Sequence, residues 1–224
     1  KRYFVFSPGW VFLIFNSVGG GTGSGLTSLI SEKLAEDFQK NSKVGIALCP
    51  SSKFSTSVVE PYNFAFYMKT FNEFIDCNLL LDNDALFEIC NEKLSIQDPK
   101  YQNMNRLIAQ SVSSITTGIR YDTWLYRDLS DITNKHRPYR NMGFMTCSFA
   151  PFTSKEEYLP QLYNVQQISE LVLRPESNLI KYRSDLGVFM SCHLLYRVDC
   201  SFEEIKRVKE VFSELEAVKF VGWS

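Results

Sequence analysis

Short apolar runs alternate with helical patterns along the first half of the chain. A continuous apolar run at residues 11–15 has the length expected of a strand covered on both faces. The apolar positions after it recur every three or four residues, which predicts a helix. These positions are Leu26, Leu29, Ile30, Leu34 and Phe38. A second strand is predicted at 43–48, so the order strand, helix, strand indicates a βαβ unit with parallel strands.

The middle of the chain continues this alternation. Residues 60–74 follow a mostly helical pattern, and the apolar run 79–81 predicts a strand that turns into another helix at 82–84. The longest helical pattern spans 101–121. Its apolar stripe consists of Met104, Leu107, Ile108, Val112, Ile115 and Ile119.

The pattern changes after this long helix. Strands are predicted at 143–149 and 187–196, on either side of a helix at 158–173, and an amphipathic helix with a short closing strand at 218–223 follows. We therefore expect an α/β chain made of a Rossmann-like nucleotide-binding domain at 1–100, a core helix at 101–121 and a mixed-sheet α+β second domain at 122–224. We expect both domains to be incomplete.

Composition and charge narrow the classes of protein. Hydrophobic residues make up 45% of the 224 residues and aromatic residues 14%, which excludes a disordered chain. The 24 Lys and Arg residues nearly balance the 25 Asp and Glu residues, so the charge indicates no attraction to nucleic acid or to an anionic membrane. The six cysteines include no C-x-x-C pair, which favours thiols in a reducing compartment. No apolar run reaches the length of about 20 residues that a membrane span needs.

Five glycines occupy seven positions in the sequence GGGTGSG at 19–25, between a predicted strand and a predicted helix. Backbone N–H groups without side chains around them can converge on an anion, and a helix N-terminus adds its dipole. Thr22 and Ser24 offer hydroxyl donors as well. A P-loop is excluded because the first lysine after the loop is Lys33, and the dinucleotide fingerprint would need glycine in place of Ser24. The loop predicts a phosphate site of another kind, and the alternative is a tight turn without a ligand.

This loop resembles the signature loop of the tubulin family. Further matches follow in the same order from about residue 9 onward. They are STSVVEPYN at 55–63, DNDA at 82–85, YQNMNRLI at 101–108, SSIT at 113–116, YR at 139–140, FAP at 149–151 and LLYR at 194–197. The segments NRLI, SS and LLYR favour the alpha chain of the family over the beta chain.

The resemblance implies that the loop holds the phosphates of GTP, with Mg²⁺ as the metal of the family and its usual acidic contact outside this chain. The implied phosphate residues are Ser17, Gly19, Gly20, Gly21, Thr22 and Gly23. Thr56 and Glu60 match residues near the sugar and phosphates, and Asn83 matches a residue at guanine. Tyr101 and Asn105 match a stacking and hydrogen-bonding pair, and their four-residue spacing puts them on one side of a helix. Without the resemblance, the alternative is that Tyr101 serves in packing and that Asn105 is a polar surface residue.

Asp131 is the candidate catalytic residue, with Asp128 one helical turn before it. The resemblance implies that an acidic residue at Asp131 reaches the GTP of the next subunit and positions water for hydrolysis. The family has Glu here, so the carboxylate of this chain is one methylene shorter. The alternative is that both aspartates stabilise a helix N-terminus. His136 and His193 lie in separate segments and predict no metal site.

The resemblance implies a GTP-binding structural subunit of microtubules, located in the cytoplasm and the cytoskeleton. Its expected partners are a beta-tubulin-like chain and the longitudinal and lateral tubulin neighbours of a filament. The expected activity is that of a tubulin-type GTPase acting across the subunit contact. We expect the first βα units of the family before residue 1 and its C-terminal helices beyond residue 224. The alternative is a truncated or degenerate tubulin-like protein that neither binds GTP nor polymerises, indicated by Tyr126 and Thr123, which depart from the family's Asn and Gly.

Overall fold

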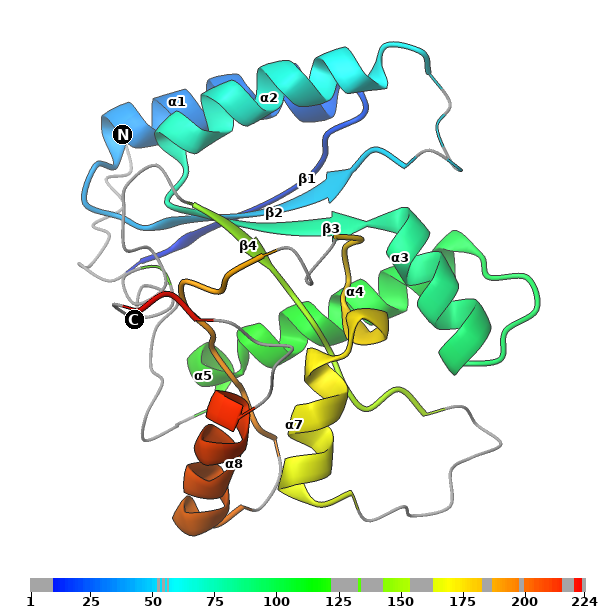
Figure 1. Ribbon diagram of the computed structural model, residues 1–224. Helices are drawn as coiled ribbons and strands as arrows, with labels where there is room; N and C mark the ends of the chain where they lie inside the picture. Colours follow the sequence, from blue (N-terminus) through cyan, green and yellow to red (C-terminus); the bar gives the residue numbers. More distant parts are fainter. Residues whose placement is uncertain are drawn as a thin grey trace. The chain divides into compact units, whose positions relative to one another are not determined.

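Three of the predicted apolar runs form neighbouring parallel strands (Figure 1). The computed structural model describes residues 10–51, 53, 55, 57–121, 133, 143–153, 163–182, 187–197, 200–214 and 220–222. One sheet in this part of the chain contains β1 (Phe12–Ser17), β2 (Lys43–Cys49), β3 (Cys77–Asp82) and β4 (Phe144–Thr146). The strands lie in the order β1-β2-β3-β4, and each neighbouring pair is parallel. The predicted α/β class is therefore confirmed.

The chain divides into two compact units. The first contains the described residues up to Asn83 and those from Thr116 to Thr146, and it holds the whole sheet. The second contains Asp84–Ile115 and the described residues from Cys147 onward. The domain limits at residues 100 and 121 stay a prediction.

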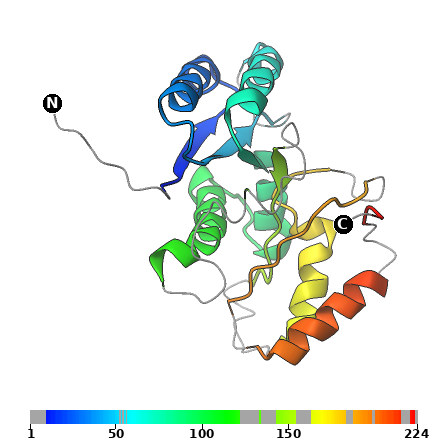
Figure 2. The same ribbon diagram turned by 90° about the vertical axis from the view of Figure 1, so that its left-hand side faces the viewer.

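Two helices cover one face of the sheet in the first unit. A π-helical turn, η1 (Thr22–Leu26), leads into α1 (Thr27–Asp37), and α2 (Glu60–Phe74) follows β2. Figures 1 and 2 show α1 and α2 side by side above the strands. A short helix, α5 (Thr117–Arg120), also belongs to this unit.

The core of the first unit lies between α2 and the sheet. It contains the buried side chains of Val18, Ala47, Tyr67, Phe71 and Ile75. The partly buried side chains of Ile14, Phe64, Met68 and Leu80 pack against this cluster. Positions 64, 67, 68, 71 and 75 have the spacing of one helix face. The helical pattern of the sequence therefore also explains which side of α2 packs on the sheet.

Three of the five apolar positions that predicted the helix α1 are exposed, whereas Phe38 packs against Phe12 of β1 with a ring-centroid distance of 5.1 Å. Leu26, Leu29 and Ile30 are 51%, 61% and 45% exposed, whereas Ser31 is fully buried. The Ser31 hydroxyl donates to the carbonyl of Thr27 at 2.8 Å, so its burial leaves no unpaired polar group. The helix is confirmed, and its buried side is the one with the small residue.

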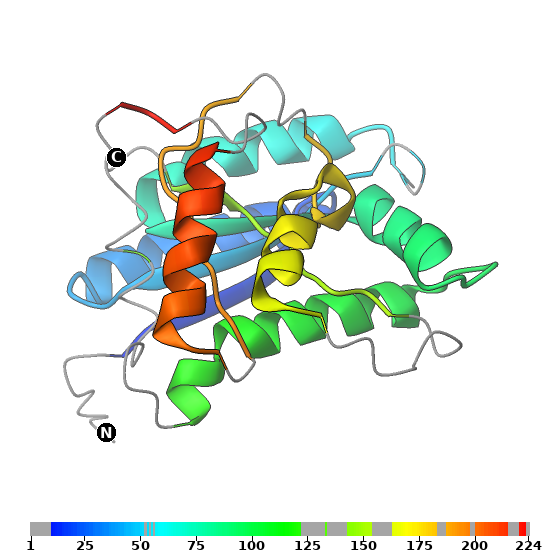
Figure 3. The same ribbon diagram turned by 60° about the horizontal axis from the view of Figure 1, so that its bottom comes forward.

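The second unit is built from helices and short bridges. Its elements are most of α3 (Asn83–Glu88), η2 (Ile89–Lys93), α4 (Tyr101–Ile115), α7 (Val165–Leu173), η3 (Pro175–Ser177) and α8 (Phe202–Glu214). Figures 1 and 3 show α7 beside α8, and Val165 and Val208 pack together between them. The predicted helix 101–121 is interrupted at Thr116, where ψ is 6°, and this separates α4 from α5. No helix in the described part of the chain is both long and apolar enough to cross a membrane.

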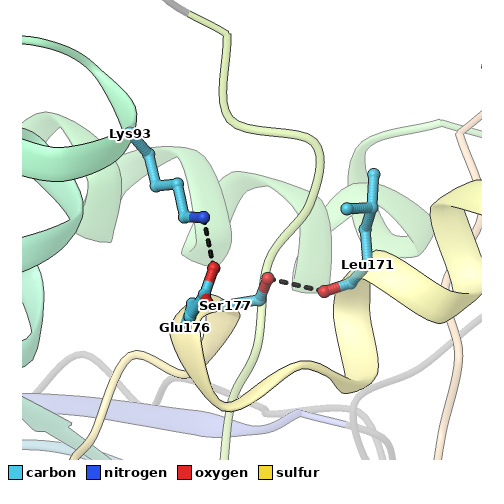
Figure 4. Close-up of polar contacts among 4 residues, drawn as sticks. All are labelled: Lys93, Leu171, Glu176 and Ser177. Carbon is cyan, nitrogen blue, oxygen red and sulfur yellow. Dashed lines mark hydrogen bonds and ion pairs between the residues drawn. The ribbon is translucent and has the colours of Figure 1, made fainter.

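Polar contacts join the short elements of the second unit (Figure 4). Lys93 at the end of η2 forms an ion pair with Glu176 in η3. The hydrogen bond from this ammonium holds the pKa of Glu176 below its usual value. The Ser177 hydroxyl donates to the carbonyl of Leu171 in α7 at 2.6 Å. These contacts fix the turn that follows α7.

Two strand predictions in the second half differ from the structure. The segment 143–149 does contain β4, but this strand pairs with β3 in the first unit. The strand predicted at 187–196 is wrong, because Phe189 alone makes a bridge there, with Phe220. A strand needs a neighbour along its whole length to satisfy its backbone groups. The mixed sheet expected in this half is seen, among the residues described there, as two isolated bridges, of which the other joins Ser148 to Asn178.

Candidate functional site

The glycine loop lies where β1 ends and η1 begins. Ser17 is the last residue of β1, and the N–H of Val18 extends the ladder by donating to the carbonyl of Leu48 at 3.0 Å. Gly21 already has the helical angles φ −60° and ψ −40°. The chain therefore turns from strand to helix within the first glycines of the loop, as the sequence predicts.

Two carbonyl groups of the loop are hydrogen-bonded to side chains of the protein. The Asn63 amide donates to the carbonyl of Gly19 at 2.8 Å, and the Ser24 hydroxyl donates to the carbonyl of Gly20 at 2.8 Å. In a trans peptide the C=O and N–H groups point in opposite directions. The N–H groups of Gly20 and Gly21 therefore point away from these two side chains. A methyl group on either glycine would meet no atom within 4 Å, so the space around both is open.

Gly23 brings the start of η1 against the end of β1. A methyl group at this position would lie 1.8 Å from the backbone oxygen of Ser17, so a residue with a side chain does not fit there. The Asn16 side chain donates to the carbonyl of Gly23 at 2.8 Å. The first N–H groups of a helix have no acceptor within the helix, so the amide of Thr22 is available to an anion together with those of the preceding glycines.

Ser24 does not act as the anion donor that the sequence predicts. Its side chain is 6% exposed, and its hydroxyl lies 2.8 Å from the carbonyl oxygen of Gly20 and 3.2 Å from that of Gly21. A hydroxyl has one proton to donate, and here the protein itself accepts it. The prediction for Ser24 is wrong, whereas Thr22 is exposed and stays a prediction.

Glu60 lies next to the first glycine of the loop. It is the first residue of α2, and a methyl group on Gly19 would lie 3.2 Å from its carboxyl carbon. A carboxylate repels phosphate, but it accepts hydrogen bonds from hydroxyl groups. This end of the loop is therefore suited to hydroxyl groups of a ligand, and the glycines beyond it are suited to an anion.

Asn83 lies at the same edge of the sheet as the loop. The strands are parallel, with Ser17 paired to Leu48 and Cys49 paired to Asp82, so their carboxyl ends meet at one edge. Asn83 follows β3 directly, which places it two strands from β1, a distance of about 10 Å. Open α/β sheets bind ligands at this edge.

The remaining predicted site residues are not placed with the loop. Tyr101 and Asn105 lie in the second unit, in the first turns of α4, and both are exposed. Thr56, Asp128 and Asp131 lie outside the described residues. The predictions for all five stay predictions.

Metal and thiol chemistry find little support at this edge. No group of three or more His, Cys, Asp or Glu residues within the described ranges is arranged to hold a metal ion. Cys49 ends β2 here, and burial raises the pKa of its thiol to about 12. A thiol that stays protonated at neutral pH is a poor nucleophile.

Sequence reasoning missed three residues that bond or support the loop. Asn63 lies inside the segment that resembles the tubulin family, so its place in the site has a signal in the sequence. Asn16, in β1, and Tyr67, in α2, are polar residues in apolar segments, and only their spatial contacts show that they meet.

Two models of the same family match the chain. Residues 10–91 match the GTPase domain of the Tubulin/FtsZ family, and residues 141–224 match the tubulin C-terminal domain. The tubulin alpha-1 chain of Arabidopsis thaliana is 39% identical over 212 residues, which cover 95% of this chain and 47% of that relative. The chain thus spans about half the length of the curated relative that it matches. The family predicted from the glycine loop and the motifs after it is confirmed, and the chain belongs to the tubulin family.

Proposed function

We propose that this chain binds GTP as an α-tubulin-type subunit and that the glycine loop holds the phosphates. The observation that carries the proposal is that the carbonyl oxygens of Gly19 and Gly20 are hydrogen-bonded to the side chains of Asn63 and Ser24. Carbonyl oxygens turned toward a phosphate would repel it. With the carbonyls on the protein side, the amides of Gly20, Gly21 and Thr22 are the groups that contact the phosphate oxygens.

The other groups at this edge support a nucleotide lying across the strand ends. Glu60 accepts hydrogen bonds from the ribose hydroxyls beside Gly19, and Asn83 contacts the guanine after β3. An amide side chain both donates and accepts, which suits a base edge. Tyr101 and Asn105 of α4 are proposed as the stacking and hydrogen-bonding pair, and Thr56 as a further sugar contact.

We propose that Mg²⁺ is bound through the phosphates of the nucleotide. The loop supplies N–H groups rather than carboxylates, and the described residues contain no cluster that could hold a metal by itself. A magnesium ion that keeps several waters and is bound through substrate phosphates is consistent with such a site. The chemistry it supplies when bound is neutralisation of phosphate charge.

The proposed partners are a β-tubulin chain and the neighbouring subunits of a microtubule in the cytoskeleton. The complete product of the gene, mixed with β-tubulin and GTP, is expected to sediment with microtubules. With GDP in place of GTP the fraction in the pellet should fall. A protein that remains in the supernatant with both nucleotides contradicts the proposal and favours the degenerate alternative.

A GTPase role for Asp131 is a separate part of the proposal. Replacing Asp131 by alanine is expected to slow GTP turnover in the polymer about 100-fold, the lower end of what a general base contributes. The amount of nucleotide bound should not change, because this residue would act on the neighbour's GTP. Single-turnover hydrolysis in assembled polymer measures the rate.

The matched control for this variant is Asp128→Ala, which removes a carboxylate three positions earlier in the sequence. It should leave turnover within about twofold. Equal rates for the wild type and Asp131→Ala would remove Asp131 from the reaction and leave GTP binding untouched.

A further inference from the structure

Tyr67 brings a hydroxyl group into the core between α2 and the sheet. Its side chain is 1% exposed and its ring stacks on Phe71 with a centroid distance of 4.4 Å. Burying a hydroxyl costs free energy unless it finds a hydrogen-bond partner, and phenylalanine would fill nearly the same volume. The partner here is the side-chain oxygen of Asn16, to which the Tyr67 hydroxyl donates at 3.0 Å.

This hydrogen bond continues to the glycine loop. The Asn16 amide accepts from Tyr67 through its oxygen and donates through its nitrogen to the carbonyl of Gly23 at 2.8 Å. Burial raises the pKa of the Tyr67 phenol, so the hydroxyl stays protonated and keeps its role as donor. The two bonds therefore have one fixed direction, from α2 through Asn16 to the loop.

A second contact joins the same helix to the other end of the loop. Asn63 precedes Tyr67 by one turn of α2 and donates to the carbonyl of Gly19 at 2.8 Å. One helix thus fixes the loop at Gly19 directly and at Gly23 through Asn16. The amides that would contact phosphate, those of Gly20, Gly21 and Thr22, lie between these two fixed points.

We propose that Tyr67 is a positioning residue for the triphosphate, acting through Asn16 to hold the first turn of η1 against the end of β1. The inference rests on the proposed function of the glycine loop. With the bond present, the loop amides keep the orientation that phosphate needs before the ligand arrives. Without it, the Asn16 side chain is free to turn and Gly23 loses its restraint.

The test compares a ligand with phosphates to one without them. Tyr67→Phe should weaken the binding of GTP about five- to tenfold, the range expected for one hydrogen bond, and should leave the affinity for guanosine unchanged. Asn16→Asp should also weaken GTP binding, because it keeps the acceptor for Tyr67 but loses the N–H that bonds Gly23. The double variant should bind GTP within about twofold of Asn16→Asp alone, since Tyr67 acts only through Asn16.

The matched control is Tyr62→Phe, which removes a hydroxyl from the same helix on a side chain that is 67% exposed. It should leave both affinities unchanged. Equal loss of GTP and guanosine binding in Tyr67→Phe, or no loss at all, would overturn the positioning role while the wild type still prefers GTP. A wild type that binds GTP no better than guanosine would remove the proposed function and this inference together.

Discussion

Replacing Gly23 by alanine is expected to abolish GTP binding, with a loss of affinity of at least about 100-fold. The added methyl group would lie 1.8 Å from the backbone oxygen of Ser17. The methyl carbon is attached directly to the backbone and the oxygen is part of it, so no rotation of a side chain can relieve the contact. The start of η1 must move away from β1, and the amides of the loop lose their common orientation. Overpacking of this kind also costs about 3 kcal/mol of the free energy of unfolding.

Gly25→Ala is the matched control for this variant. It adds the same methyl group two residues later, where no atom lies within 4 Å. The free energy of unfolding should rise by about 0.5 kcal/mol, because alanine is a better helix residue than glycine. Equilibrium dialysis with labelled GTP measures the affinity, and urea unfolding measures the stability. If Gly23→Ala binds GTP as Gly25→Ala does, the close contact at Ser17 has no part in the site.

Replacing Gly45 by alanine is expected to have the second large effect, and this effect is on the fold. Gly45 lies in β2, and a methyl group there would lie 2.2 Å from Cζ of Phe71 and 2.4 Å from Oδ1 of Asn78. Both neighbours are fully buried, so neither side chain has free space to move into. The free energy of unfolding should fall by about 3 kcal/mol.

A compensating change separates this steric effect from a general weakness of β2. Phe71→Leu shortens the side chain that meets the new methyl group, so the double variant should be less destabilised than the sum of the two single variants, by about 1 kcal/mol. Gly20→Ala, which meets no atom within 4 Å, should change the stability by no more than about 0.5 kcal/mol. Strict additivity of the two single effects would show that Phe71 is not the obstacle.

The parallel strands of the first unit are predictable because their signal is local. Continuous apolar runs mark β1, β2 and β3 within about two residues of their ends. The expectation that the first of these strands is covered on both faces is wrong, because Phe15 in β1 is 54% exposed. The strand-to-helix junction is predictable for the same reason, since five glycines in seven positions allow few other structures.

Local sequence patterns do not predict which distant segments pair as neighbouring strands. The segment 143–149 has the composition of a strand, but its partner is β3, more than 60 residues earlier in the chain. The segment 187–196 has a similar composition and makes a single bridge. Residues typical of strands are those that fit a half-buried pleated surface. Whether a neighbouring strand provides that surface depends on the tertiary structure.

The residues of the site also divide into those that local sequence patterns reveal and those that only the tertiary structure reveals. The glycines and Glu60 are visible in the sequence, and so is Asn63 through the motif that contains it. The contact between Asn16 and Tyr67 joins residues 51 positions apart, and neither residue has a spacing that would single it out. Ser24 is the opposite case, because its hydroxyl is conspicuous in the loop but bonds a carbonyl of the loop itself.

The most direct measurement of the central claim is the NMR response of the loop amides to nucleotide. Labelling the protein with ¹⁵N at glycine gives signals from its 11 glycines. GTP should shift the amide signals of Gly20 and Gly21, guanosine should leave them in place, and Gly45 in the core should respond to neither ligand. Binding of GTP with the Gly20 and Gly21 signals unmoved would contradict the claim that these backbone amides hold the phosphates.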